Sequence, residues 1–180
     1  MNIFDKGFKE ILASELASMF GGLVGGIFLA VYVDKIFFIP GMFILFPGFL
    51  DMRGNISGAL ASRLSSGLFL GIINPSKLNT KIIRGNLLAS FFLAMVVSLV
   101  LGTLAFLFSL IVFDIFVPKI ILAALLAGII ANAIEVPLTL LATFYFFKKG
   151  HDPNNIIGPV ITTSGDVISI LSLLVALFII

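Results

Sequence analysis

Cysteine and tryptophan are both absent from this 180-residue chain, and histidine occurs once. The lack of cysteine excludes disulfides, thiolate metal sites and a cysteine nucleophile. Charged residues are also scarce, at 11% of the sequence, whereas about a quarter of a soluble domain is charged. The net charge of +2 is too small to indicate a nucleic-acid partner. The composition is therefore not that of an ordinary soluble domain.

Apolar residues make up 60% of the chain, and its mean hydropathy is +1.24. Both values indicate an all-α integral membrane protein, because a membrane helix needs about 20 mostly apolar residues. Without tryptophan, the side chains at the two membrane surfaces must come from phenylalanine, tyrosine, lysine and arginine. We predict one multi-pass domain over residues 1–180 in the cell membrane, with no soluble regulatory domain.

The apolar runs predict five membrane-spanning helices. Their predicted ranges are residues 11–33, 36–73, 86–113, 119–147 and 155–180. The second range is long for one crossing, and PGFLDMRGNISG, from Pro47 to Gly58, interrupts it with glycine, proline and charges. Such residues are tolerated at membrane depth only against protein or a wet cavity. We expect a long helix that is tilted or kinked and whose middle faces the protein interior.

Basic residues are distributed unequally between the two ends of the predicted spans. One end has Lys6, Lys9, Lys77, Lys81, Arg84, Lys148 and Lys149, and the other has Lys35 and Lys119. Loops rich in lysine and arginine stay in the cytoplasm, so the N-terminus is predicted to be cytoplasmic. Five crossings then place the C-terminus on the opposite side.

Charged side chains inside the predicted spans are candidates for function, because each costs about 2.5–3.5 kcal/mol at the centre of a membrane helix. The candidates are Glu15, Asp51, Arg53, Arg63, Glu135 and Asp166. Asp51 and Arg53 are close enough in sequence to form a structural ion pair. Glu15 and Arg63 lie towards span ends, where a long side chain can reach the interface.

Glu135 lies two residues before Pro137, and a proline inside a helix frees a carbonyl in the preceding turn. A carboxylate and a free carbonyl would make a cation ligand pair. A protonated Glu135 that bonds across a helix interface explains the residue equally well.

Asp166 lies in TTSGDVISI, residues 162–170, with no basic residue near it in the last span. Thr162 is four residues earlier and therefore on the same helix face, and Gly165 and Ser169 are related in the same way. Oxygen ligands of this kind suit hard cations such as Mg²⁺. The alternative is a hydrogen-bonded patch between helices, with a neutral Asp166.

Asn55 adds a neutral oxygen to the second span. Gly54 and Gly58 beside it are four residues apart, which allows a partner helix to approach closely. In a dimer, Asn55 and Asp166 from both copies would surround one axial path. Few direct ligands suit Mg²⁺, because this ion keeps several of its waters.

Two other motifs have structural interpretations. Paired glycines from Gly21 to Gly26 are predicted to form a packing face on the first helix. Asp152 and Pro153 are predicted to begin the last helix, with the aspartate as its cap. His151 beside Asp152 is only a weak sign of a metal site.

Two segments resemble the membrane domain of the MgtE-type divalent cation (magnesium) transporters. PGFLDMRGNISGALASRLSSGLFLG, from Pro47 to Gly71, is similar to the form in the animal solute-carrier magnesium transporters, where a Gly-Asn pair precedes Ala-Ser-Arg-Leu-Ser. HDPNNIIGPVITTSGDVISI, from His151 to Ile170, resembles the Asp-Pro-rich entry to that family's last helix, which continues to Gly-Asp. Together the segments cover about a quarter of the chain.

The resemblance implies a homodimeric or tandem-repeat pore for divalent cations, chiefly Mg²⁺. It implies that Asp166 binds the ion, that Asn55 is the asparagine of the Gly-Asn pair, and that Thr162 faces the ion path. The animal forms hold two such domains, whereas this half-size chain holds one, which favours a parallel homodimer. Asp51 departs from the usual apolar residue, and it would either add a second acidic ring or pair with Arg53.

Divalent cation transport, without enzymatic activity, is the leading hypothesis. The predicted metal ligands are Asp166, Asn55, Thr162, Asp51 and Glu135. One alternative is an intramembrane aspartyl protease, which needs two carboxylates that share a proton. Asp51 would be the second acid, although a neighbouring arginine favours its ionised form. The other alternative is a non-catalytic membrane subunit whose polar stripe serves only assembly.

Overall fold

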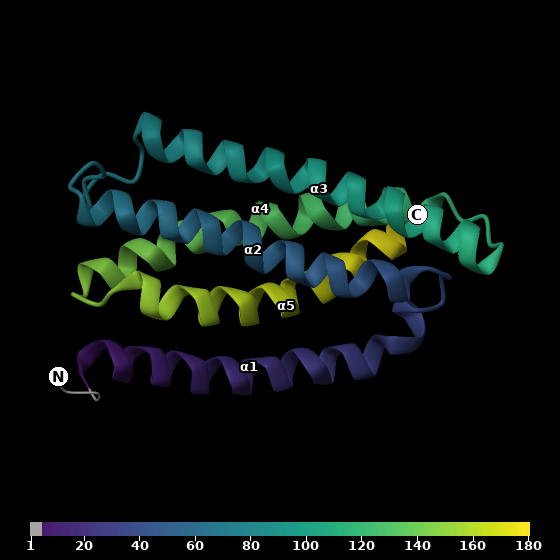
Figure 1. The fold of residues 1–180 in the computed structure, drawn as a ribbon, viewed down its shortest axis with the longest axis horizontal. Helices are drawn as coiled ribbons and strands as arrows, with labels where there is room; N and C mark the ends of the chain where they lie inside the picture. The colour runs from purple at the N-terminus through teal and green to yellow at the C-terminus, as the bar shows by residue number, and fades with distance from the viewer. Residues whose placement is uncertain (1–4) are drawn as a thin grey trace.

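Residues 5–180, the part that the computed structural model describes, form five α-helices. Their bounds are α1 Lys6–Ile36, α2 Met42–Phe69, α3 Lys81–Phe113, α4 Lys119–Lys148 and α5 Pro153–Ile179. Figure 1 shows them lying along one common axis, with successive helices running in opposite directions. The prediction of an all-α protein is confirmed.

The helices have the length and composition of membrane spans. α1, α3, α4 and α5 are each long and apolar enough to cross a membrane. α2 has 28 residues, or about 42 Å at 1.5 Å per residue, but its polar side chains lower its hydropathy. The protein is therefore a multi-pass membrane protein.

The predicted second span, residues 36–73, was too long at both ends. Ile36 belongs to α1, and the chain then turns through Gly41, whose φ of 87° is in the left-handed region that favours glycine. The segment from Pro47 to Gly58 does not interrupt α2, which is continuous. Pro47 lies in the second turn of α2, so its missing N–H affects only the start of the helix.

Side chains near the helix ends satisfy backbone groups as the sequence indicates. Asp5 accepts a hydrogen bond from the Phe8 N–H at 2.8 Å and begins α1. Asp152 accepts one from the Asn154 N–H at 2.9 Å, and Pro153 follows in the first position of α5. The predicted cap of the last helix is confirmed.

Of the four glycines predicted to form a packing face on α1, Gly21 and Gly25 do so, whereas Gly22 and Gly26 have nothing within 4 Å of an added β-carbon. Gly21 lies against Thr163 of α5, and a β-carbon at Gly25 would lie 3.8 Å from Asp166 Cβ. Ser18 Oγ and Thr163 Oγ1 share a hydrogen bond of 2.5 Å beside these contacts. α1 packs mainly against α5, and most of its apolar side chains remain exposed, as lipid contact requires.

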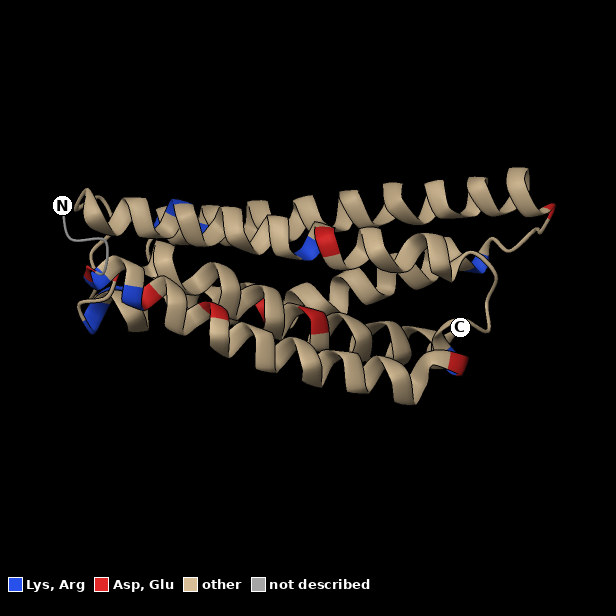
Figure 2. Ribbon diagram, turned by 60° about the horizontal axis from the view of Figure 1, so that its bottom comes forward, with Lys and Arg blue, Asp and Glu red and all other residues tan. Residues whose placement is uncertain are grey.

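The bundle keeps most of its charge away from the middle. Figure 2 shows that the charged residues gather mainly at the two ends and that a smaller group lies midway along the helices. The largest apolar core cluster packs α2, α3, α4 and α5 together around side chains such as Phe49 and Leu173. The charges midway along this bundle are the ones that need a functional or structural explanation.

Candidate cation site

Asp51 and Asn55 lie on an exposed face of α2. Both side chains are exposed, and Asn55 Nδ2 donates a hydrogen bond to Asp51 Oδ2 at 3.0 Å. Ser62 and Ser66 are exposed farther along the same helix, and successive members of the set 51, 55, 62 and 66 are four or seven residues apart. These positions share one helix face, which makes a polar stripe. The sequence prediction missed the two serines, although their spacing from Asn55 would have revealed them.

Thr162 and Asp166 lie on the neighbouring helix, α5. Thr162 is exposed and Asp166 is half-buried. A β-carbon at Gly54 would lie 3.7 Å from Thr162 Oγ1, so α2 and α5 approach closely at this level. Thr162 donates its hydroxyl hydrogen to the Gly158 carbonyl at 2.9 Å, which leaves its oxygen lone pairs free.

α2 and α5 run in opposite directions, as Figure 1 shows. One turn back from Gly54 along α2 reaches Asp51, and one turn forward from Thr162 along α5 reaches Asp166. The two acids therefore lie at about the same depth in the bundle. The Gly54–Thr162 contact thus brings together the turns of α2 and α5 that carry Asp51, Asn55, Thr162 and Asp166. Asp51 and Asn55 also line a cavity with Val97 and Leu101 of α3.

Glu135 is placed differently from the other predicted ligands. Its side chain is 0% exposed and forms an ion pair with Arg53 of α2. Arg53 Nη2 also donates to the Ala131 carbonyl at 3.4 Å. The alternative in which Arg53 pairs with Asp51 is therefore wrong, because two residues along a helix turn the side chain by about 200°.

The remaining charged candidates hold helices together or face outward. Arg63 donates to the Ala59 carbonyl at 3.2 Å and to Ser90 Oγ at 3.0 Å, which ties α2 to α3. Glu15 is exposed on α1.

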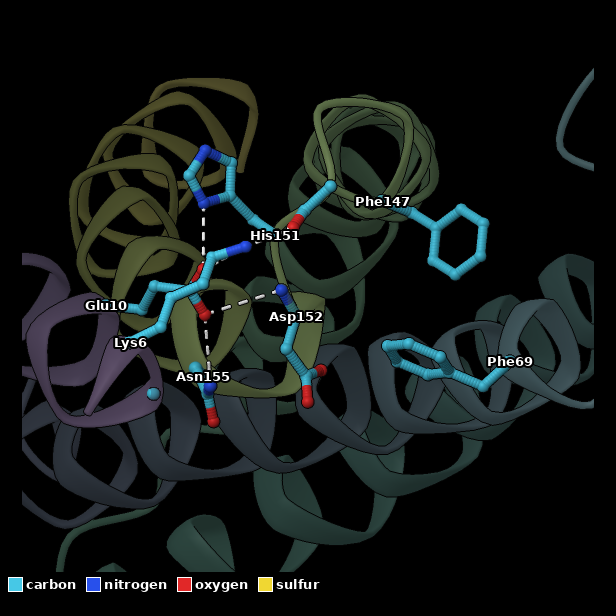
Figure 3. Close-up of a pocket in the computed structure, with 9 residues that line it drawn as sticks. Lys6, Glu10, Phe69, Phe147, His151, Asp152 and Asn155 are labelled. Carbon is cyan, nitrogen blue, oxygen red and sulfur yellow. Dashed lines mark hydrogen bonds and ion pairs between the residues drawn. The ribbon is translucent and has the colours of Figure 1, made fainter. Parts of the chain in front are cut away.

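A second polar cluster joins the start of α1 to the α4–α5 connection (Figure 3). Glu10 accepts hydrogen bonds from His151 Nδ1 at 2.9 Å, Asn155 Nδ2 at 3.1 Å and the Asp152 N–H at 3.4 Å. Lys6 Nζ lies 3.7 Å from the same carboxylate. The cluster lines a cavity of about 420 Å³. It holds α1 at the end of the bundle where α5 begins.

Burial raises the pKa of Glu10, but the hydrogen bonds from His151, Asn155 and Asp152 and the charge of Lys6 together lower it below its usual 4.5. A carboxyl with a lowered pKa stabilises the fold fully above its ordinary pKa and loses that contribution as the pH falls through the folded value.

We therefore expect the first turns of α1 to detach in acid. Amide protons there should lose protection about tenfold between about pH 5 and pH 3, because protonated Glu10 binds its donors more weakly than the carboxylate does. Hydrogen exchange read by mass spectrometry on the purified protein measures this. Glu10→Gln should weaken the pH dependence, and a profile equal to that of the wild type would contradict the assignment.

No group of three or more His, Cys, Asp or Glu within residues 5–180 lies close enough to hold a metal ion. The exposed residues of α2 and α5 thus offer few oxygens. These are the half-buried carboxylate of Asp166, the carboxylate of Asp51, which accepts a hydrogen bond from Asn55, and neutral side-chain oxygens. A sparse set of this kind does not suit a dehydrated cation, but it can contact a cation through its waters.

The chain matches known proteins over most of its length. The family model MgtE, described as a divalent cation transporter, matches residues 46–176. Solute carrier family 41 member 2 of Gallus gallus is 29% identical over 175 residues, covering 89% of this chain and 29% of that protein. The human and mouse proteins of the same name are 29% and 28% identical, with the same coverage. No solved structure matches the chain significantly.

The curated relatives are much longer, and this chain spans 29% of their length. The matched region begins in α2 and ends in α5, so it includes Asp51, Asn55, Thr162 and Asp166. The family is one of transporters rather than enzymes, which sets aside the protease alternative. This chain belongs to the MgtE family of divalent cation transporters.

Proposed function

We propose that this protein carries divalent cations, chiefly Mg²⁺, across the cell membrane through a pore between two parallel copies. Asp166 is the central acidic ligand, and Asn55 and Thr162 supply neutral oxygens. Asp51 adds a second acid beside Asn55. The ion keeps part of its hydration shell, because the side chains on each copy are too few to replace it.

The observation that carries this proposal is the exposed polar face of α2 and α5 in a bundle of membrane helices. Asp51 and Asn55 are exposed there, and Asp166 is half-buried. Facing lipid, an ionised carboxylate would cost several kcal/mol, about 2.5–3.5 on insertion scales. The face must therefore be covered by protein or water, and a second copy of the chain provides both a cover and a matching set of oxygens.

Glu135 is left out of the proposed ion path. Its carboxylate is buried and paired with Arg53, so it does not reach the exposed face. The ion path of each copy then contains the two acids Asp51 and Asp166. Two copies together would surround the cation with a ring of negative charge.

We place the N-terminus in the cytoplasm. The starts of α1, α3 and α5 lie at one end of the bundle in Figure 1, and this end carries the basic residues that predict a cytoplasmic location. The membrane potential then favours entry, with about 2.3 kcal/mol available per charge for every 100 mV. α2 also crosses the membrane, which makes five spans in all, and its polar stripe faces the second copy.

The absence of native cysteine provides a direct test of the pore. In Asn55→Cys, a single thiol would line the ion path, so a charged thiol reagent should lower Mg²⁺ uptake into liposomes at least about tenfold, equivalent to about 1.4 kcal/mol.

The matched control is Leu107→Cys on α3, whose side chain is 41% exposed on an apolar helix face. Treatment of this variant with the same reagent should leave uptake unchanged. If mass spectrometry shows that residue 55 is modified while uptake stays at the unmodified rate, the proposed path is wrong.

A further inference from the structure

Arg53 and Glu135 form a buried ion pair at the centre of the bundle. Their side chains are 1% and 0% exposed. Arg53 comes from α2 and Glu135 from α4, and Arg53 also donates to the Ala131 carbonyl one turn away on α4. The guanidinium thus makes two contacts with the same stretch of α4, which fix both the rotation and the height of α2 against it.

The pair also contacts a third helix. A β-carbon on Gly165 of α5 would meet Glu135 Oε1, so the carboxylate lies directly against the α5 backbone. Gly165 immediately precedes Asp166. On α2, Arg53 lies between Asp51 and Asn55 in sequence but points to the opposite side of the helix. One interaction therefore joins the turn of α2 and the turn of α5 that carry the proposed ion ligands.

Stability alone does not explain an ion pair at this position. Taking two charges out of water costs free energy that their attraction only partly returns, and apolar residues of similar volume often stabilise a fold as well or better. Buried pairs have their best-attested use in fixing the register of one helix against another. Here the register that is fixed is that of α2 against α4 and α5.

We propose that Arg53 and Glu135 are positioning residues for the ion path. Their pair holds Asn55 and Asp166 at the separation at which both contact one hydrated cation. This inference rests on the function proposed above. Loosening the pair would move the ligands apart without removing any of them. The half-saturating Mg²⁺ concentration should therefore rise by a larger factor than the factor by which the maximal uptake rate falls.

Two variants test this in liposomes that contain the full chain. Arg53→Met with Glu135→Leu removes both charges and keeps the volume, whereas Glu135→Asp keeps the charge and shortens the side chain. Both should raise the half-saturating Mg²⁺ concentration about tenfold, equivalent to about 1.4 kcal/mol, while the maximal rate falls less. Thermal unfolding in detergent confirms that the protein measured is folded.

The matched control is Arg63→Gln, which changes the other arginine of α2, a residue that contacts α3. Its half-saturating concentration should equal that of the wild type. If the double variant does not fold, Glu135→Asp carries the test. Wild-type half-saturation in the folded variants would overturn the inference.

Asp166→Asn in the same assay separates the two proposals. If Asp166→Asn loses uptake while the double variant and Glu135→Asp transport with wild-type half-saturation, only the positioning role fails. If Asp166→Asn transports normally, the proposed ion path itself fails, and the positioning role fails with it.

Discussion

Replacing Asp166 by asparagine is expected to reduce Mg²⁺ uptake by about a hundredfold, equivalent to about 2.7 kcal/mol. The substitution keeps the shape of the side chain and removes only its charge. Asp166 is half-buried and beside Gly25 of α1, so its carboxylate is only partly solvated. In such a setting a charge interacts with a cation more strongly than it does in bulk water.

The measurement is uptake into liposomes that hold the purified protein, with a Mg²⁺ dye inside, a fixed potential and no gradient of Na⁺ or H⁺. Asp114→Asn is the matched control, because Asp114 is exposed where α3 ends and asparagine tolerates its φ of 54°. Uptake in this control should equal that of the wild type.

The outcomes of this experiment separate the remaining functions. Loss of uptake in Asp166→Asn alone supports a passive pathway through Asp166. Equal uptake in the wild type and the variant would contradict that pathway and favour the role of an assembly subunit. No uptake in the wild type would call for gradients of Na⁺ and H⁺, added one at a time.

Replacing Gly165 by alanine is expected to destabilise the protein by about 1–3 kcal/mol, the usual cost of overpacking a core. The new methyl group would meet Glu135 Oε1. Glu135 cannot swing aside, because its carboxylate is held by Arg53 inside the bundle. The α5 turn that carries Asp166 must therefore move, and Mg²⁺ uptake should fall together with the unfolding temperature.

Gly85→Ala provides the control for this prediction. Gly85 lies in the first turns of α3 with nothing within 4 Å of an added β-carbon. Alanine there should be neutral or stabilising by up to about 1 kcal/mol, since alanine favours the helix more than glycine does. Equal unfolding temperatures for Gly165→Ala and Gly85→Ala would show that the contact with Glu135 is not restrictive.

The class of the protein and its helices could be predicted from sequence because both depend on local composition. Long apolar runs and scarce charge require helices that satisfy their own backbone hydrogen bonds. Asp166 stood out for the same reason, as a lone acid in an apolar run. The end of α1 was harder to predict from the sequence, because apolar residues continue through the turn at Gly41 and give no sign of the boundary.

Side-chain partners were decided by the tertiary structure. Sequence proximity suggested that Arg53 pairs with Asp51, but helix geometry sends these side chains to opposite faces. The carboxylate that pairs with Arg53 belongs to Glu135 of α4. In the sequence, the whole of α3 lies between α2 and α4. The sequence by itself determined a membrane bundle with acids inside it. Only the packing of α2, α4 and α5 decided which acid is neutralised in the core and which acids lie on the exposed face, because that choice depends on helix rotation and on contacts between distant segments.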